Sequence, residues 1–240
     1  VSMGHITRPV EFRRALAGAT VHDFFNLIAV LILLPLELST GYLQKLAGGA
    51  STVFTGMGGM KLANPIKAGV EPAVTLLTDT IGDHPWLALI VALVMMYASL
   101  KFLVDLARGL VVSKAERFLH QYLFGAAPYA MLFGVLMTIA VQSSSITTSL
   151  IIPLVGAGIL TVEQIFPYTL GANVGTTVTA MLAALSTANV SAITIAFVHL
   201  LFNLSGIVLI YPIAAIRRIP IRLSHALASF ASQSRGWAIA

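Results

Sequence analysis

Long apolar stretches, interrupted by short polar runs, dominate the pattern of this 240-residue chain. Four stretches are nearly free of charged residues: 27–36, 86–100, 130–141 and 191–215. A helix of about 20 apolar residues is long enough to cross the hydrocarbon core of a bilayer, where backbone polar groups must be paired within the chain. The pattern therefore predicts an all-α integral membrane protein that crosses the membrane several times.

Composition and charge agree with this interpretation. Hydrophobic residues make up 58% of the chain and charged residues 10%, whereas about a quarter of an average soluble domain is charged. The Lys and Arg residues lie at the ends of apolar segments and are not interleaved with aromatic residues on polar helices, so the net charge of +5 does not indicate nucleic-acid binding. Cys is absent from the sequence, which excludes disulfides and thiolate metal sites.

The distribution of basic residues predicts the orientation in the membrane. Clusters at 8–14, 101–117 and 217–222 are expected to be cytoplasmic by the positive-inside rule. The stretch 39–85, rich in Gly, Ser and Thr, is expected on the outer face, with 66–77 forming a short amphipathic helix on the membrane surface.

One apolar stretch near the middle of the chain is predicted to enter the membrane and return. Three apolar stretches follow the second basic cluster: 128–158, 165–185 and 191–213. Both flanking clusters are expected on the same side, so the chain between them must cross an even number of times. The polar run 142–145 divides the first stretch, and Pro153 and Gly156 loosen its second arm. We therefore expect a re-entrant hairpin with arms 128–141 and 146–158 and the polar run at its tip.

The chain contains an internal repeat. Segments 21–37 and 198–214 align without gaps at a constant offset of 177 positions and share six identities. The identities include His22 with His199 and Asn26 with Asn203, residue types that are uncommon in membrane helices. Because secondary transporters are usually built from such repeats, the sequence predicts an inverted-repeat transporter fold with discontinuous helices.

This pattern divides the chain into four parts. They are the end of a first repeat with one membrane helix (1–40), an extracytoplasmic loop (41–85), a second repeat (86–225) and a truncated C-terminal segment (226–240). The second repeat is expected to contain a membrane helix, the hairpin, a broken helix and another membrane helix. In this interpretation the rest of the first repeat precedes Val1.

The polar run at the expected hairpin tip is the strongest candidate for chemistry. Seven hydrogen-bonding side chains fall within eight residues: Gln142, Ser143, Ser144, Ser145, Thr147, Thr148 and Ser149. A single Ser or Thr in a membrane helix often bonds to a carbonyl of the preceding turn. Adjacent residues, however, point to different sides of a helix. A broken backbone that lines a polar cavity therefore explains the run better.

A second polar interruption follows at residues 171–177. Gly171 and Gly175 are also spaced for close packing of two helices, which is the alternative explanation. Two such interruptions in consecutive short apolar segments favour a binding site, so we expect a second helix break here. Helix N-termini at breaks attract anions, and the oxygens of Ser, Thr and Asn suit a hard cation such as Na⁺.

Three polar residue types remain in the repeated helices. The His and Asn pairs at i, i+4 spacing suit metal binding or proton transfer, but they recur without accompanying acids, which favours hydrogen bonding between helices. Asp23 has no acidic counterpart, because Leu200 occupies the equivalent position, and a carboxylate within a membrane helix is a functional candidate.

Several of these motifs together resemble a known family. The runs Gln142–Ser145, Tyr168–Thr177 and Glu11–Asn26 closely resemble the type II sodium–phosphate cotransporters, and the resemblance extends over residues 1–225. It implies two inverted repeats, each with a Gln-Ser-Ser-Ser hairpin, which bind phosphate and sodium between them. It also implies that an Asp at position 23 marks electrogenic members with an added sodium site.

The resemblance implies the following binding residues. For phosphate they are Gln142, Ser143, Ser144, Ser145, Asn173, Thr176 and Thr177. For sodium they are Asp23, Gln142, Ser144, Thr147 and Asn173. No cofactor is expected besides Na⁺ as the coupling ion. The expected partners are inorganic phosphate, membrane lipid and the remainder of the first repeat, with a homodimer as an open alternative.

Other functions remain open at this stage. A transporter of another oxyanion or a small carboxylate fits the same residues, because helix N-termini do not select among anions. An intramembrane serine hydrolase with His199 or His22 as base is less favoured, since the Ser run lacks the Gly-flanked turn of such nucleophiles. A scaffold without transport activity is the third alternative.

Overall fold

The structure, a computed structural model, describes residues 9–54, 65–82, 84–110, 123–187 and 189–233. The regular structure in these ranges is α-helical, as expected. The helices are α1 (Pro9–Thr40), α2 (Tyr42–Phe54), α3 (Pro65–Ile81), α4 (Pro85–Leu110), α6 (Ala127–Val141), α7 (Ser144–Gly156), α8 (Val162–Thr187), α9 (Val190–Ile210) and α10 (Ala214–Gln233).

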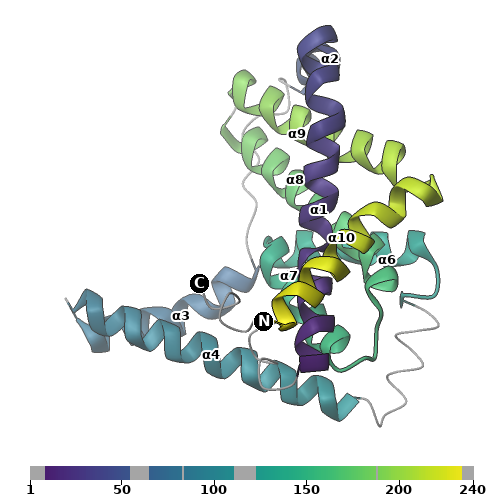
Figure 1. Cartoon of the computed structure of the whole chain (residues 1–240). Coiled ribbons are helices and arrows are strands. Elements are labelled where there is room, and N and C mark those ends of the chain that lie inside the picture. The colour runs from purple at the N-terminus through teal and green to yellow at the C-terminus, as the bar shows by residue number, and fades with distance from the viewer. Residues whose placement is uncertain (1–8, 55–64, 83, 111–122, 188, 234–240) are drawn as a thin grey trace.

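Helix α1 is the axis around which α7, α8, α9 and α10 are arranged (Figure 1). Its buried face repeats every four residues at Val21, Phe25, Ala29 and Leu33. At its C-terminus, Gly41 has a φ of 61°, a left-handed conformation that favours glycine and lets the chain turn into α2. The Glu37 carboxylate accepts hydrogen bonds from the backbone N–H groups of Leu43 and Gln44, so α1 itself caps α2.

The outer surface of the helices is apolar. Leu31 on α1 is 66% exposed and Trp86 on α4 is 78% exposed. Within the described residues, α1 and α9 are long and apolar enough to cross a membrane. An apolar surface of this extent needs a partner, and lipid provides it for a membrane protein.

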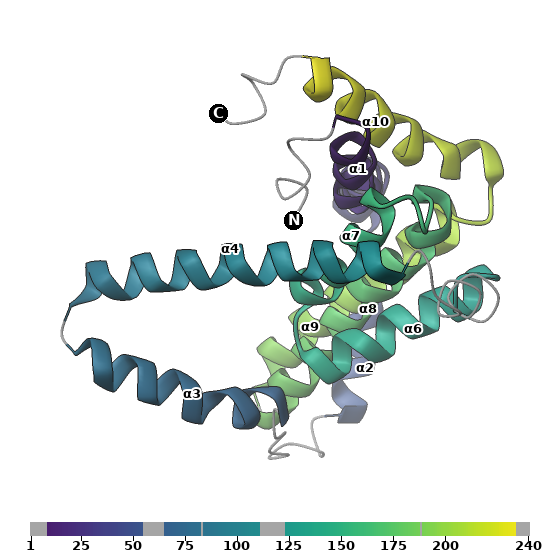
Figure 2. The ribbon, with the colours of Figure 1, turned by 90° about the horizontal axis from the view of Figure 1, so that it is seen from below.

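Helices α3 and α4 form an antiparallel pair that extends away from the other helices (Figures 1 and 2). The expected helix at 66–77 is confirmed, and it is longer than predicted at its C-terminal end. Its place on the membrane surface stays a prediction. Residues 1–8 and 111–117 of the basic clusters lie outside the described residues.

The break predicted between the arms of the hairpin is present but shorter than expected. Gln142 has a φ of 55° and its N–H donates to the carbonyl of Thr138 at 2.7 Å, which ends α6. Ser143 is extended, and its hydroxyl accepts a hydrogen bond from the N–H of Ile146 at 3.3 Å. Because this cap starts α7, Ser144 and Ser145 belong to its first turn and not to an irregular tip.

The second break, predicted at residues 171–177, is wrong: α8 is continuous through these residues. The glycines have a different purpose. A Cβ at Gly171 would collide with the carbonyl oxygen of Met131, and a Cβ at Gly134 would collide with the carbonyl oxygen of Tyr168. A Cβ at Gly175 would lie 2.7 Å from the Cβ of Thr138. The glycines therefore let the backbones of α6 and α8 touch, which is the small-residue packing left open as the alternative.

Side chains around Tyr168 hold α7 and α8 together. The hydroxyl of Tyr168, which is fully buried, donates to the carbonyl of Thr147 at 2.9 Å. Its ring packs against those of Phe124 and Phe133 at centroid separations of 5.7 and 5.6 Å. The N-terminal half of α7 is therefore fixed on α8 by a buried polar contact, while the aromatic rings pack α8 against α6 and the segment before it.

The contact between α6 and α8 generates a prediction. Replacing Gly171 with Ala should lower the free energy of unfolding by about 1–3 kcal/mol, because an added methyl group forces the two backbones apart. The measurement is the midpoint of thermal unfolding in detergent micelles. Gly49→Ala in α2 is the matched control, because nothing lies within 4 Å of its added Cβ and Ala favours a helix more than Gly does. A midpoint for Gly171→Ala that equals that of Gly49→Ala would contradict the tight contact.

Candidate functional site

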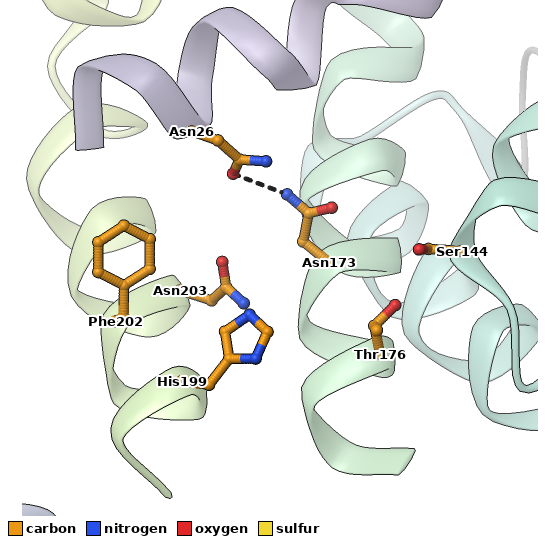
Figure 3. Close-up of a pocket in the computed structure, with 7 residues that line it drawn as sticks. All are labelled: Asn26, Ser144, Asn173, Thr176, His199, Phe202 and Asn203. Carbon is orange, nitrogen blue, oxygen red and sulfur yellow. Dashed lines mark hydrogen bonds between the residues drawn. The ribbon is translucent and has the colours of Figure 1, made fainter. Parts of the chain in front are cut away.

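A cavity of about 280 Å³ lies where α1, α7, α8 and α9 meet (Figure 3). Its lining residues are Asn26, Ser144, Asn173, Thr176, His199, Phe202 and Asn203. Except for Phe202, each of these residues carries a side chain that forms hydrogen bonds. A polar cavity among such apolar helices is the principal candidate for a binding site.

The cavity brings together the two polar runs that the sequence singled out. Ser144 comes from the first turn of α7, whereas Asn173 and Thr176 come from the middle of α8. Figure 3 shows the hydroxyls of Ser144 and Thr176 between these two helices. Three of the predicted site residues therefore share one cavity, even though α8 is unbroken.

Other predicted residues do not line the cavity. Thr147 and Thr177 are fully buried, and their hydroxyls donate to carbonyls of their own helices, those of Ser143 and Val174. This is the helix-internal bonding expected for single Thr residues. Gln142 and Ser145 are exposed outside the lining.

Asp23, the predicted sodium ligand, also lies outside the cavity lining. Its side chain is 65% exposed, and its Oδ1 atom lies 3.2 Å from Nε2 of His22. The adjacent imidazole is a partner that the sequence analysis did not consider for this carboxylate. The His22 side chain consequently faces Asp23, while its repeat counterpart His199 lines the cavity.

The cavity also contains residues that were not predicted as ligands. Asn173 donates from Nδ2 to Oδ1 of Asn26 at 3.0 Å, and this bond joins α8 to α1. It is an interhelical hydrogen bond, the role favoured for the repeated Asn residues. Asn203 and His199 line the opposite side on α9. Their i, i+4 spacing and their recurrence in the repeat were the signals that pointed to them.

The N-terminus of α7 offers hydrogen-bond donors at the cavity. The first backbone N–H groups of a helix have no partner within the helix, and the dipole makes this end positive. The Ser143 hydroxyl accepts a hydrogen bond from the N–H of Ile146. The N–H groups and hydroxyls of Ser144 and Ser145 donate no hydrogen bond within the described residues. The Ser144 end of α7 can therefore donate to an anion.

Oxygen atoms on α8 complement these donors. The Thr176 hydroxyl donates to the carbonyl of Ala172 at 3.1 Å, which leaves its lone pairs for another partner. Asn173 uses its Nδ2 group on Asn26, so its Oδ1 atom remains an acceptor. Hydroxyl and amide oxygens are the ligands that hard cations prefer.

Of the described lining residues, only His199 is titratable, and none is permanently charged. Among the described residues that surround the cavity there is no Lys, Arg, Asp or Glu. Clusters of three or more His, Asp or Glu side chains that might hold a transition metal are also absent from the described part of the chain. An anion in this cavity would depend on hydrogen bonds, the α7 dipole and an accompanying cation.

The amino-acid sequence of the chain is similar to a known family and to curated proteins. The sequence model of the Na⁺/Pi-cotransporter family matches residues 84–220. The chain is 33% identical to sodium-dependent phosphate transport protein 2A of Mus musculus, in an alignment covering 95% of this chain and 48% of that protein. It is 31% identical to sodium-dependent phosphate transport protein 2B of Bos taurus, covering 95% and 46%. No solved structure matches.

The chain thus spans about half the length of the curated relatives that it matches. The matched region runs from just before α4 into α10 and includes the N-terminus of α7 and the cavity-lining residues of α8 and α9. On this match, and on the identity that extends over 95% of its length, the chain belongs to the Na⁺/Pi-cotransporter family.

Proposed function

We propose that this chain supplies the second-repeat half of a sodium-coupled transporter of inorganic phosphate in the plasma membrane. The observation that carries the proposal is the meeting of the α7 N-terminus with the Asn26–Asn173 amide pair in one neutral cavity. The names of the relatives, which are sodium-dependent phosphate transport proteins, support the same substrate and the same coupling ion.

Phosphate binds at the N-terminus of α7. The hydroxyl of Ser144 and the free N–H groups of the first turn donate to its oxygens, and the positive end of the helix dipole favours its charge. Ser143 orients these donors by capping the helix, so its contribution is to position Ser144.

Sodium binds beside the phosphate, on the α8 side of the cavity. The free oxygens of Asn173 and Thr176, together with the Ser144 hydroxyl oxygen, supply hard ligands for the cation. The coupling of sodium binding to phosphate binding follows from their opposite charges. A cavity without Lys or Arg holds a multivalent anion poorly at membrane depth, and a bound Na⁺ lowers the cost of burying that anion.

The site lies at an interface between two inverted repeats. Asn26 belongs to the end of the first repeat, yet its side chain reaches the cavity of the second repeat and bonds to Asn173. Transporter sites are commonly built between repeats in this way, with re-entrant or interrupted helices at the midplane. Helices α6 and α7 form such a re-entrant hairpin. We expect both repeats to be necessary for transport.

The alternative functions differ in the chemistry that each requires. The chain belongs to a family of transporters, so the serine-hydrolase hypothesis is set aside. A scaffold without transport activity requires neither the unpaired donors of Ser144 nor the unpaired oxygen of Asn173. Transport of a different oxyanion is tested by competition with phosphate.

Ser144→Ala should lower sodium-dependent phosphate uptake. The chain is expressed together with its flanking coding sequence, and uptake of radioactive phosphate is measured in sodium and in choline medium. Loss of one hydrogen bond to a charged ligand costs about 1.5–3 kcal/mol, so the KM for phosphate should rise about tenfold or more. Surface expression should not change, because Ser144 bonds to no other side chain in the described structure.

Ser39→Ala is the matched control for this experiment. The Ser39 hydroxyl is exposed and bonds to carbonyls of its own helix, so its loss should leave uptake unchanged. Equal uptake by the Ser144→Ala and Ser39→Ala proteins would remove Ser144 from the phosphate site. Reduced surface expression with a normal KM would favour the scaffold hypothesis.

Asp23→Gly should remove one positive charge from each transport cycle if Asp23 contributes to an added sodium site, as the family resemblance implies. The measurement compares phosphate-evoked current with phosphate uptake in the same cells. His22→Gln is the control, because it removes the imidazole beside Asp23 but keeps the carboxylate. An unchanged charge-to-phosphate ratio in Asp23→Gly would show that the contact with His22, and not sodium, explains the carboxylate.

A further inference from the structure

Asn203 is a buried amide that has no partner in the described part of the chain. The residue is only 4% exposed and lines the cavity on the α9 side. No hydrogen bond joins its side chain to another described residue. Its amide is open to the cavity, so both of its polar groups are available to whatever the cavity holds, water or a ligand.

The internal repeat allows the unpaired Asn203 to be compared with an equivalent residue. Asn26 is the counterpart of Asn203, and its Oδ1 atom is satisfied by Asn173. The two Asn residues thus occupy equivalent positions in α1 and α9, but only the first has a partner within the described chain. Packing between helices therefore explains Asn26 and leaves Asn203 free for the contents of the cavity.

Figure 3 shows how the cavity is divided. Ser144 and Thr176 lie on one side of it, on α7 and α8, and Asn203 and His199 lie on the other, on α9. An anion that receives hydrogen bonds from the α7 end would turn its remaining oxygens toward α9. The two walls together could contact an anion from both sides.

The amide of Asn203 holds a donor, Nδ2, and a separate acceptor, Oδ1, in one rigid plane. Inorganic phosphate near neutral pH keeps at least one P–OH group, which is a hydrogen-bond donor, alongside its accepting oxygens. Sulfate is fully ionised and offers acceptors only. A buried acceptor such as Oδ1 of Asn203 can therefore accept a hydrogen bond from phosphate, whereas sulfate would leave it unpaired.

We propose that Asn203 selects a protonated tetrahedral oxyanion, with Oδ1 accepting from the P–OH group of phosphate and Nδ2 donating to a neighbouring oxygen. This inference rests on the proposed function and names the residue that rejects sulfate. Arsenate carries the same kind of hydroxyl group and is accepted.

His199 has a different part in the same wall. Its side chain is exposed and lines the mouth of the cavity, and no hydrogen bond engages it in the described structure. A neutral imidazole carries one donor and one acceptor, but at this exposed residue an acceptor that a bound anion leaves unpaired can bond to water. His199 therefore adds affinity for the anion, whereas the discrimination between phosphate and sulfate belongs to Asn203.

The test measures sodium-dependent uptake of radioactive phosphate with arsenate or sulfate as competitor, in the protein expressed with its flanking coding sequence. Arsenate should inhibit the parent protein and excess sulfate should not. Asn203→Leu, which keeps the size but not the polar atoms, should raise the KM for phosphate about tenfold or more and make sulfate an effective competitor. Asn203→Ser restores a donor and an acceptor, and should exclude sulfate again.

His199→Ala should raise the KM for phosphate while sulfate remains excluded. The matched controls are His84→Ala, a substitution of an exposed histidine outside the cavity, and Asn189→Ser, which keeps the N-cap of α9. Both should have the KM of the parent protein.

Three results would overturn the inference. A parent protein without sodium-dependent phosphate uptake would refute the proposed function and this inference together. Phosphate uptake by the parent with an unchanged KM and unchanged sulfate exclusion in Asn203→Leu would refute this inference alone. If both Asn203 variants lower the amount of folded protein at the surface and leave KM unchanged, Asn203 packs against another polypeptide segment instead.

Discussion

The arrangement of the cavity depends on the direct contact between the backbones of α6 and α8. Gly134 and Gly171 allow this contact, because a side chain at either position would collide with a carbonyl oxygen of the other helix. Helix α6 ends at Val141, and only Gln142 and Ser143 separate it from the first residue of α7. On α8, Asn173 lies in the sequence between Gly171 and Gly175, both of which touch α6. The distance between the donors of α7 and the oxygens of α8 is therefore set by glycines that never touch a ligand.

The rest of the architecture follows from the lipid that surrounds the helices. The helices expose apolar side chains outward and collect amides and hydroxyls inside, the arrangement that a bilayer requires. Outside the cavity lining, the buried hydroxyls of Thr147 and Thr177 are already satisfied by carbonyls of their own helices. What remains unsatisfied is a small set of donors and acceptors on three helices, and these are the groups that a ligand can use.

The long apolar stretches predicted the helical fold, and the run of Gln and three Ser predicted an interruption over 142–145, because such a run cannot be absorbed by one helix face. The structure confines this interruption to Gln142 and Ser143. Ser144 and Asn173, both predicted site residues, line one cavity. The predictions from sequence failed where the role of a residue depends on its neighbours in the folded chain. Gly171 looks the same in a broken helix and in a tight helix contact, and only the position of Met131 distinguishes them. Asn203 was attributed to helix packing, since its missing partner is visible only in three dimensions.

The hydrogen bond between Asn26 and Asn173 links residues 147 positions apart in the sequence and joins α1 to α8. Such bonds between membrane helices contribute about 1 kcal/mol, close to thermal energy. A relative movement of α1 and α8 can therefore break and remake this bond without a large barrier. In the transport cycle proposed above, the amide pair would favour one arrangement of these two helices without preventing the other.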